Sequence, residues 1–461
     1  MGTTIADRLG QFAYSLRFED IPSEVVDKAA LLVLDALGVA IAAGPADFVN
    51  RAVAAVEDLA DDGGGDATVI GASRGYPLRD AILLNGVLVH GLDYDETHPA
   101  GVVHGTASAL PTALGLAEKL GSTGQEFLTA FIIGLEVNAR LGMAAQGGFH
   151  RVGFHPTGLV GAFGASLIAG RLRGLGAAQL AEAQGFVGSL ASGSMAFLDT
   201  GAWTKRIHPG WAGVAGTTAA SFAAQGFPSP PDIYEGRFGL YATHLEDLGR
   251  ADLEVCTDSL GVRWETMQVA VKPYPACHFT HAFADAALAI RALHGVAVED
   301  IAMVTCLIAP GEVSTVCEPL DRKRAPCSSY EAQFSVPYVT AAALRHGEFT
   351  LRQLEPEALR DPVVLALAAK VDYVEDPASG FPASFSGEVV VKTKDGRVVR
   401  HREQINRGAG DRPLGRSEIE AKFASTAGSV RSNSEIEQLV NTVTKLGSAV
   451  NLAELAGLLR A

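Results

Sequence analysis

The spacing of apolar residues along the first part of the chain predicts one helix after another. Up to about residue 265, apolar side chains recur every three or four positions, as they do on one face of a helix. From Gly158 to Gly170, small residues repeat at the same spacing, which would let a neighbouring helix approach closely. Two early faces consist of Leu9, Phe12, Ala13 and Leu16, and of Val25, Val26, Ala29, Leu32, Val33 and Ala36.

The pattern changes after Trp264. Residues 303–308 and 371–374 resemble strands, and residues 389–394 and 397–402, joined by Asp395-Gly396, predict a β-hairpin. Helical patterns near 282–293, 331–345 and 362–369 lie among them. Near Ser417 the chain returns to helix, with Ser417 and Glu420 at the spacing of a capping box.

Length supports two domains, because 461 residues are too many for one ordinary core. We therefore predict a mainly α fold. Its large all-helical domain is built from both chain ends, residues 1–265 and 405–461, and residues 266–404 form a smaller α+β domain.

Composition and charge narrow the class of protein. A net charge of −15 argues against nucleic acid as a partner and against an anionic membrane surface. No basic segment followed by an apolar run indicates a signal peptide, and the longest nearly uncharged run, residues 157–170, is too short to span a bilayer. The five cysteines form no CxxC motif, so we expect a reduced, cytoplasmic compartment.

The segment VHGLDYDETHPAGVVHGTASALP, residues 89–111, stands out from its apolar surroundings. Ten of its 23 residues are His, Asp, Glu, Thr, Ser or Tyr, in a chain with only 19% charged residues. Apolar stretches on both sides, residues 81–89 and 107–117, look like core helices. Buried polar groups must be paired or take part in chemistry, because burying them unpaired costs several kcal/mol. The segment therefore predicts an active-site loop between two helices.

Three other polar clusters interrupt apolar sequence, at residues 150–157, 203–208 and 272–278. Seven of the twelve histidines lie in these three clusters or in the 89–111 segment: His90, His98, His104, His150, His155, His208 and His278. Any one of them alone is better explained as a hydrogen-bonded structural residue. If the clusters converge, however, they form a cationic, titratable site in an acidic protein.

Such a site suits a small substrate with more than one carboxylate, because Lys and protonated His donate charge-assisted hydrogen bonds. The same groups would stabilise an enolate formed beside a carboxylate. Other chemistries have less support: the chain contains no GxSxG, HExxH or P-loop motif, and the glycines of 158–170 lack a preceding strand. The acidic run from Asp93 to His98 could offer oxygen ligands to a divalent metal, but no second acidic cluster completes a site, so we expect none.

Five ordered motifs resemble the MmgE/PrpD family. They are the 90–111 segment, GFHPTG at 153–158, TKRIHPG at 204–210, KPYPACHFTHAFADAAL at 272–288 and EAQFSVPY at 331–338. The resemblance covers nearly the whole chain. It implies that the smaller α+β domain, residues 266–404, is a lid domain, and that the protein is a homodimer that uses no cofactor. Members include 2-methylcitrate dehydratase, cis-aconitate decarboxylase and iminodisuccinate epimerase.

Carried over residue by residue, the resemblance implies a set of site residues. The catalytic candidates are Asp93, His104, His155 and His278, and the substrate-binding candidates are Thr97, Lys205 and Lys272. In one respect the chain departs from the family: many members follow the loop histidine with Pro-Ser, whereas Gly105-Thr106 follow His104 here.

The resulting hypothesis is a cofactor-free lyase that moves a proton next to a carboxylate of a small di- or tricarboxylate. Dehydration is the leading expectation, and decarboxylation or epimerisation in the same kind of pocket is the alternative. A non-enzymatic helical scaffold is the hypothesis from another class, and it would leave the polar clusters dispersed. We expect the site residues to line one pocket between the two domains, over which the lid closes.

Overall fold

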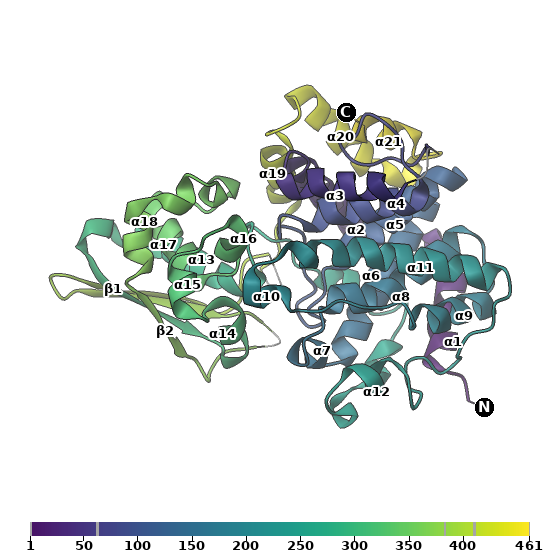
Figure 1. Cartoon of the computed structure of the whole chain (residues 1–461), viewed down its shortest axis with the longest axis horizontal. Helices are drawn as coiled ribbons and strands as arrows, with labels where there is room; N and C mark the ends of the chain where they lie inside the picture. The colour runs from purple at the N-terminus through teal and green to yellow at the C-terminus, as the bar shows by residue number, and fades with distance from the viewer. Residues whose placement is uncertain (1, 61–63, 382–383, 409–411, 461) are drawn as a thin grey trace. The chain divides into compact units, whose positions relative to one another are not determined.

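The computed structural model describes residues 2–60, 64–381, 384–408 and 412–460. Its internal contacts divide the chain into two compact units (Figure 1). The first comprises Met1–Phe197, Ala202–Val269 and Gly415–Ala461, and the second comprises Leu198–Gly201 and Ala270–Leu414. The fold is mainly α with a small α+β part, as predicted.

The first unit is helical. Its helices are α1 (Ile5–Ser15), α2 (Ser23–Ala43), α3 (Asp47–Leu59), α4 (Leu78–His90), α5 (Gly105–Leu120), α6 (Gly124–Ala144), α7 (Gly148–Arg151), α8 (Pro156–Leu172), α9 (Ala177–Val187), α11 (His208–Ala224), α12 (Leu240–His244), α19 (Arg416–Ala427), α20 (Asn433–Thr444) and α21 (Ala453–Leu459). A 3₁₀ turn, η2 (Trp203–Ile207), precedes α11, and α10 (Phe197–Thr200) lies at a boundary between the units.

Helix α8 lies at the centre of the first unit, packed against α5, α6, α9 and α11. The small residues along it allow these close contacts. A Cβ added at Gly164 would lie 2.2 Å from Asn138 Oδ1, and one at Gly216 of α11 would lie 2.6 Å from the Cβ of Ala165. The close approach predicted from the small-residue repeat is therefore present.

Helix α6 lies outside the run at 157–170 that the sequence analysis weighed as a membrane span. Its 21 residues are long and apolar enough to cross a bilayer by length and composition, which the run at 157–170 was not. Within the structure, 94% of its most apolar stretch of 18 residues is buried, as in the core helix of a globular protein.

The second unit contains a four-stranded sheet in the order β2-β1-β3-β4. Strands β1 (Ile301–Ile308) and β2 (Val371–Glu375) are parallel, whereas β3 (Gly387–Thr393) pairs antiparallel with both β1 and β4 (Val398–Glu403). Asp395-Gly396 forms the predicted hairpin turn, with Gly396 at a φ of 92°. Its helices are α13 (His281–His294), α14 (Pro310–Val316), α15 (Leu320–Arg324), α16 (Ser329–Gln333), α17 (Val336–His346) and α18 (Pro362–Ala368).

Two predicted local details are wrong. The helix expected near 331–345 is broken into α16 and α17, because Ser335 caps α17 by accepting a hydrogen bond from the Tyr338 amide at 2.9 Å. The capping box expected at Ser417 and Glu420 is absent. The N-cap is Gly415, whose own N–H donates to the Glu418 carboxylate at 2.9 Å, so α19 begins earlier than the Ser417 pattern suggested.

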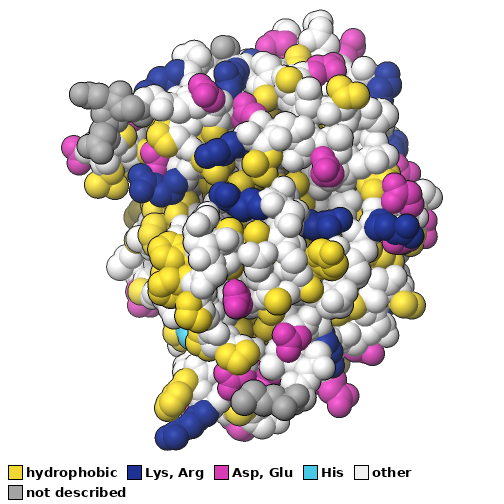
Figure 2. Space-filling model, turned by 90° about the vertical axis from the view of Figure 1, so that its right-hand side faces the viewer, with side chains coloured by type: hydrophobic (Ala, Val, Ile, Leu, Met, Phe, Trp, Pro, Cys, Tyr) yellow, Lys and Arg dark blue, Asp and Glu magenta, His cyan; other side chains and the backbone are white. Residues whose placement is uncertain are grey.

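Surface charge is mixed on the face drawn in Figure 2. Acidic and basic side chains are interspersed there, with apolar side chains among them. The net charge of −15 is therefore not gathered into one acidic patch on that face.

Candidate active site

The polar segment is the loop that joins α4 to α5, as the sequence predicted. Helix α4 ends at His90 and α5 begins at Gly105. Within the loop, His98 and Val103 form an antiparallel bridge, with the His98 amide donating to the Val103 carbonyl at 2.7 Å. The His104 amide donates to Thr157 Oγ1 of α8 at 3.0 Å. The loop is thus held both by itself and by the central helix.

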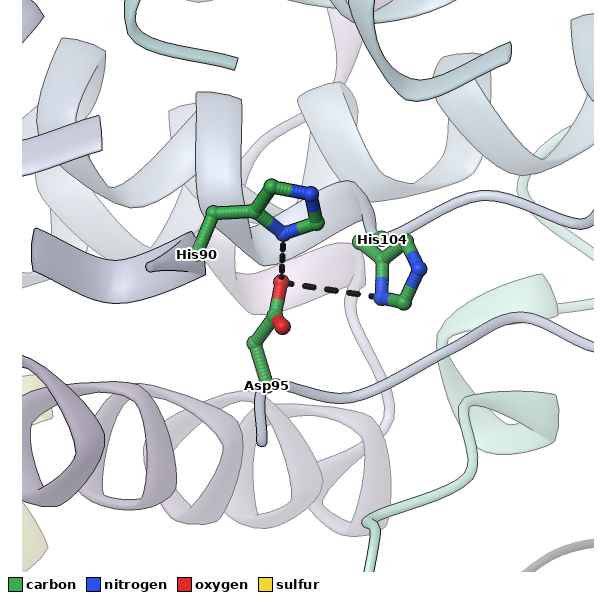
Figure 3. Close-up of side chains that lie close together, drawn as sticks. All are labelled: His90, Asp95 and His104. Carbon is green, nitrogen blue, oxygen red and sulfur yellow. Dashed lines mark hydrogen bonds and ion pairs between the residues drawn. The ribbon is translucent and has the colours of Figure 1, made fainter. Parts of the chain in front are cut away.

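One carboxylate of this loop lies between two imidazole rings (Figure 3). Asp95 Oδ2 is 2.6 Å from Nδ1 of His90 and 3.6 Å from Nδ1 of His104. The two rings meet edge to face, with centroids 4.9 Å apart. His90 and Asp95 are fully buried, and His104 is largely buried.

The hydrogen bonds of His104 determine which of its nitrogens can react. Its Nδ1 lies 2.7 Å from the carbonyl oxygen of Glu96, which can only accept, so Nδ1 carries the hydrogen. Thr97 Oγ1 lies 3.4 Å from the same nitrogen. The nitrogen of His104 that can exchange a proton with a substrate is therefore Nε2.

His90, Asp95 and His104 also form a group whose ligand atoms lie within 4.8 Å of one another, a spacing that could suit a metal. The same contacts also have the geometry of hydrogen bonds. His104 Nδ1 lies 2.7 Å from the Glu96 carbonyl oxygen, which can only accept. The 2.6 Å contact between His90 and Asp95 is likewise a short, charge-assisted hydrogen bond. The group fits a hydrogen-bonded triad.

Two further histidines extend the cluster from the starts of helices. His155 is the N-cap of α8, and His208 is the first residue of α11; proline follows each of them, as suits the first turn of a helix. Their Nδ1 atoms are 3.1 Å apart, so one donates and the other accepts. His155 stacks on His90 at 5.5 Å between centroids and lies 6.1 Å from His104.

The electrostatic environment keeps His155 and His208 neutral. Burial, then the Lys205 ammonium, lowers the pKa of His155 well below its usual value. Burial, then His90 and Lys205, lowers the pKa of His208 to about 4. The pKa of His150, also lowered by burial and by Lys205, is about 4 as well.

The lysine predicted to bind substrate forms an ion pair. Lys205 Nζ, in η2, donates to Asp93 Oδ2 at 3.0 Å, and both residues are buried. Asp93 has a φ of 50°, a left-handed conformation that Asp adopts more readily than most residues. The next residue, Arg206, donates to the Gly91 carbonyl at 2.8 Å and so fixes the start of the loop.

Charged groups also lie beneath the loop. Lys422 of α19 donates to the Tyr94 carbonyl at 2.9 Å and pairs with Asp35 of α2 at 2.7 Å. Burial, then the Asp95 carboxylate, raises the pKa of Glu96 to about 8, so this acid stays protonated at neutral pH. Glu96 is therefore a neutral acid that lies next to the Asp95 carboxylate in the same loop.

Lys272 and His278 belong to the second unit. Lys272 is fully buried, and His278 Nε2 lies 2.5 Å from the side-chain nitrogen Nδ2 of Asn406. The His278 ring lies 4.6 Å from that of His281. Their membership of the same site as the loop residues stays a prediction.

The structure brings Asp93, Thr97, His104, His155 and Lys205 together in the first unit. Three members of the cluster were not among the predicted site residues: His90, Asp95 and His208. Each lay within a polar segment that the sequence singled out. The signal for His208 was its position before Pro209, which repeats the His155-Pro156 pair.

Comparisons with known proteins agree with this architecture. The family description "MmgE/PrpD N-terminal domain" matches residues 7–250, and "MmgE/PrpD C-terminal domain" matches residues 274–446. The chain is 28% identical to the cis-aconitate decarboxylase of Homo sapiens, with 99% of this chain and 95% of that protein covered. It is 27% identical to that of Mus musculus, covering 99% and 93%, and 26% identical to a cis-aconitate decarboxylase-like protein of Aspergillus oryzae, covering 99% and 97%.

Proposed function

This chain belongs to the MmgE/PrpD family, and from that premise we propose that it releases CO₂ from a small unsaturated polycarboxylate, with cis-aconitate as the first candidate. The family and the relatives indicate a lyase-type enzyme that acts on carboxylates. Three relatives carry the name cis-aconitate decarboxylase or a name derived from it, which supports decarboxylation. Dehydration, the leading expectation from the sequence, has no such support, so decarboxylation, which was given as an alternative, takes its place.

The observation that carries the proposal is the meeting of three helix N-termini and a buried lysine around four imidazole rings. His104, His155 and His208 stand at the starts of α5, α8 and α11. The unpaired N–H groups at a helix N-terminus favour an anion nearby. The Lys205 ammonium, paired with Asp93, lies close enough to His155 and His208 to add to the lowering of their pKa values by burial. These features suit a substrate with more than one carboxylate.

The reaction requires one bond to break and one proton to be delivered. The bond between a carboxylate carbon and the saturated carbon that bears it breaks, and CO₂ leaves. The electron pair is delocalised through the adjacent double bond to a carbon that bears a second carboxylate. A proton then forms the new C–H bond at one end of this allylic unit. His104 suits the donor role, because its Nδ1 is held by the Glu96 carbonyl and its Nε2 can deliver the proton. Neutral His104 afterwards regains a proton from solvent.

Product analysis by NMR tests the proposal. The enzyme is incubated with cis-aconitate and, separately, with 2-methylcitrate, and CO₂ and water loss are followed. One CO₂ per molecule of cis-aconitate is expected, with no dependence on EDTA. Dehydration of 2-methylcitrate with no CO₂ from cis-aconitate would overturn the proposal in favour of the sequence's first expectation.

A lysine variant tests the binding role with a matched control. Lys205→Met should raise KM by about 10- to 100-fold, since a hydrogen bond to a charged group contributes roughly 1.5–3 kcal/mol. Lys119→Met removes an exposed lysine in the last turn of α5 and should leave KM unchanged. Equal KM values for the two variants would remove Lys205 from the substrate site.

A further inference from the structure

The four imidazoles of the cluster experience different charges. Burial lowers the pKa values of His155 and His208, and the Lys205 ammonium is one of the positive charges that lower both further. His90 and His104 instead contact the Asp95 carboxylate, at 2.6 Å and 3.6 Å. A positive charge among the rings is therefore stabilised on the Asp95 side and opposed on the Lys205 side. The cluster is electrostatically divided, although all four rings lie close together.

Asp95 is suited to hold a negative charge beside His90 and His104. Its neighbour Glu96 keeps its proton up to a pKa of about 8, partly because of the Asp95 charge. Asp35 below it is also pushed towards the neutral form, by burial and by Asp95 among other causes, although Lys422 opposes this shift. The short contact with Nδ1 of His90 satisfies one Asp95 oxygen.

We propose that His90 and Asp95 are positioning residues that keep His104 protonated for catalysis. In this arrangement, the Nδ1–H of His90 holds Asp95 ionised and fixes its direction, and the carboxylate stabilises the imidazolium of His104. The pair thereby sets the pH up to which His104 Nε2 can deliver a proton. Neither residue touches the substrate in this role, and the inference rests on the proposed decarboxylation.

Other charged groups around His104 oppose or balance this effect. His155 of α8 lies 6.1 Å from it between ring centroids, His208 of α11 contacts His155, and Lys205 with Asp93 lies on the η2 side. Below the loop, Glu96 is neutral, burial raises the pKa of Asp35 and lowers that of Lys28, and the Lys422 ammonium pairs with Asp35 at 2.7 Å. Among the described contacts, Asp95 is the carboxylate within ion-pair distance of His104.

The first test is the pH profile of Asp95→Asn. The amide can still accept from His90 but carries no charge. Catalytic activity requires protonated His104 and therefore falls as the pH rises. Loss of the Asp95 carboxylate should lower the pH at which activity falls by about one to two units. At a pH above the fall, kcat should drop about 10- to 100-fold, with KM changed much less.

Glu265→Gln is the matched control. Glu265 is a second buried carboxylate paired with a histidine of the same loop, His98, at 3.3 Å, outside the four-ring cluster. This variant should leave the pH profile where it is. A profile that shifts equally in both variants would show a general effect of lost charge and overturn the inference.

Rescue by a conservative change tests His90. His90→Asn can offer an amide N–H in place of Nδ1–H and should keep kcat within about tenfold of the natural protein, whereas His90→Ala should lose about 100-fold. If the alanine and asparagine variants are equally impaired although both are folded, the donor role of His90 is wrong.

An activity-independent measurement separates this inference from the proposed function. In protein labelled with ¹⁵N-histidine, the His104 signals, assigned with His104→Gln, should titrate to lower pH in Asp95→Asn. A shift seen in a protein that releases no CO₂ would leave the electrostatic inference standing and refute the proposed function. CO₂ release by a protein in which the His104 titration is unshifted would support the proposed function and refute the electrostatic inference.

Discussion

The spacing of the histidine cluster depends on a contact between two glycines. Gly86 of α4 and Gly210 of α11 face each other, and a Cβ added at Gly86 would lie 2.3 Å from the Cα and 2.4 Å from the nitrogen of Gly210. His90 follows Gly86 by one helical turn, and His208 directly precedes Pro209-Gly210. The two backbones therefore set the distance between the ends of α4 and α11 from which these histidines project.

Gly86→Ala should force the two helices apart. Ordinary contact begins at 3.4 Å, so the added methyl requires a shift of about 1 Å, and backbone atoms cannot rotate away. Overpacking of this kind costs roughly 1–3 kcal/mol, and the higher helix propensity of Ala returns up to about 1 kcal/mol. We expect a net loss of about 2 kcal/mol. A misplacement of about 1 Å should also lower kcat about 100-fold.

Urea denaturation and CO₂ release measure the two effects separately. The control is Gly457→Ala in α21, where an added Cβ meets nothing within 4 Å. This variant should keep full activity and be as stable as the natural protein or slightly more stable. A Gly86→Ala protein with unchanged unfolding and unchanged kcat would refute the claim that this contact positions the cluster.

Other changes test the groups around the cluster. Lys422→Met should destabilise the fold by about 3 kcal/mol in urea titrations, because Asp35 loses its partner, and adding Asp35→Asn should recover part of the loss. Folded Glu96 keeps its proton up to a pKa of about 8, against 4.5 ordinarily, so stability should fall as the pH rises between these values, and Glu96→Gln should flatten this dependence. In steady-state kinetics, His104→Gln should mainly lower kcat, by about 100-fold or more.

Much of the fold could be predicted because its elements have strong local patterns. The apolar stretches at 81–89 and 107–117 became α4 and α5, and Asp395-Gly396 marked the hairpin of β3 and β4. Helix ends were less predictable. The break between α16 and α17 depends on the single Ser335 cap, which a continuous helical pattern hides.

The candidate site was predictable as a region more than as a set of contacts. Polar interruptions in apolar sequence located the loop, and the family resemblance pointed to Asp93 and His104. Which acid of the Asp-Tyr-Asp-Glu run contacts histidine depends on the backbone: Asp93 turns at a φ of 50° and pairs with Lys205, while Asp95 lies beside His90 and His104. The sequence pattern does not contain that turn, and His90 was counted in the polar segment but not chosen as a site residue.

Solvent isotope incorporation tests the central claim most directly, that the histidine cluster delivers a proton to the carbanion left when CO₂ departs. The enzyme is given cis-aconitate in D₂O, and the product is examined by NMR and mass spectrometry. The account predicts one CO₂ released and one deuterium incorporated per molecule, in a new C–H bond at one end of the allylic unit left by the lost carboxylate. A product formed by addition or loss of water with all carboxylates retained would contradict it.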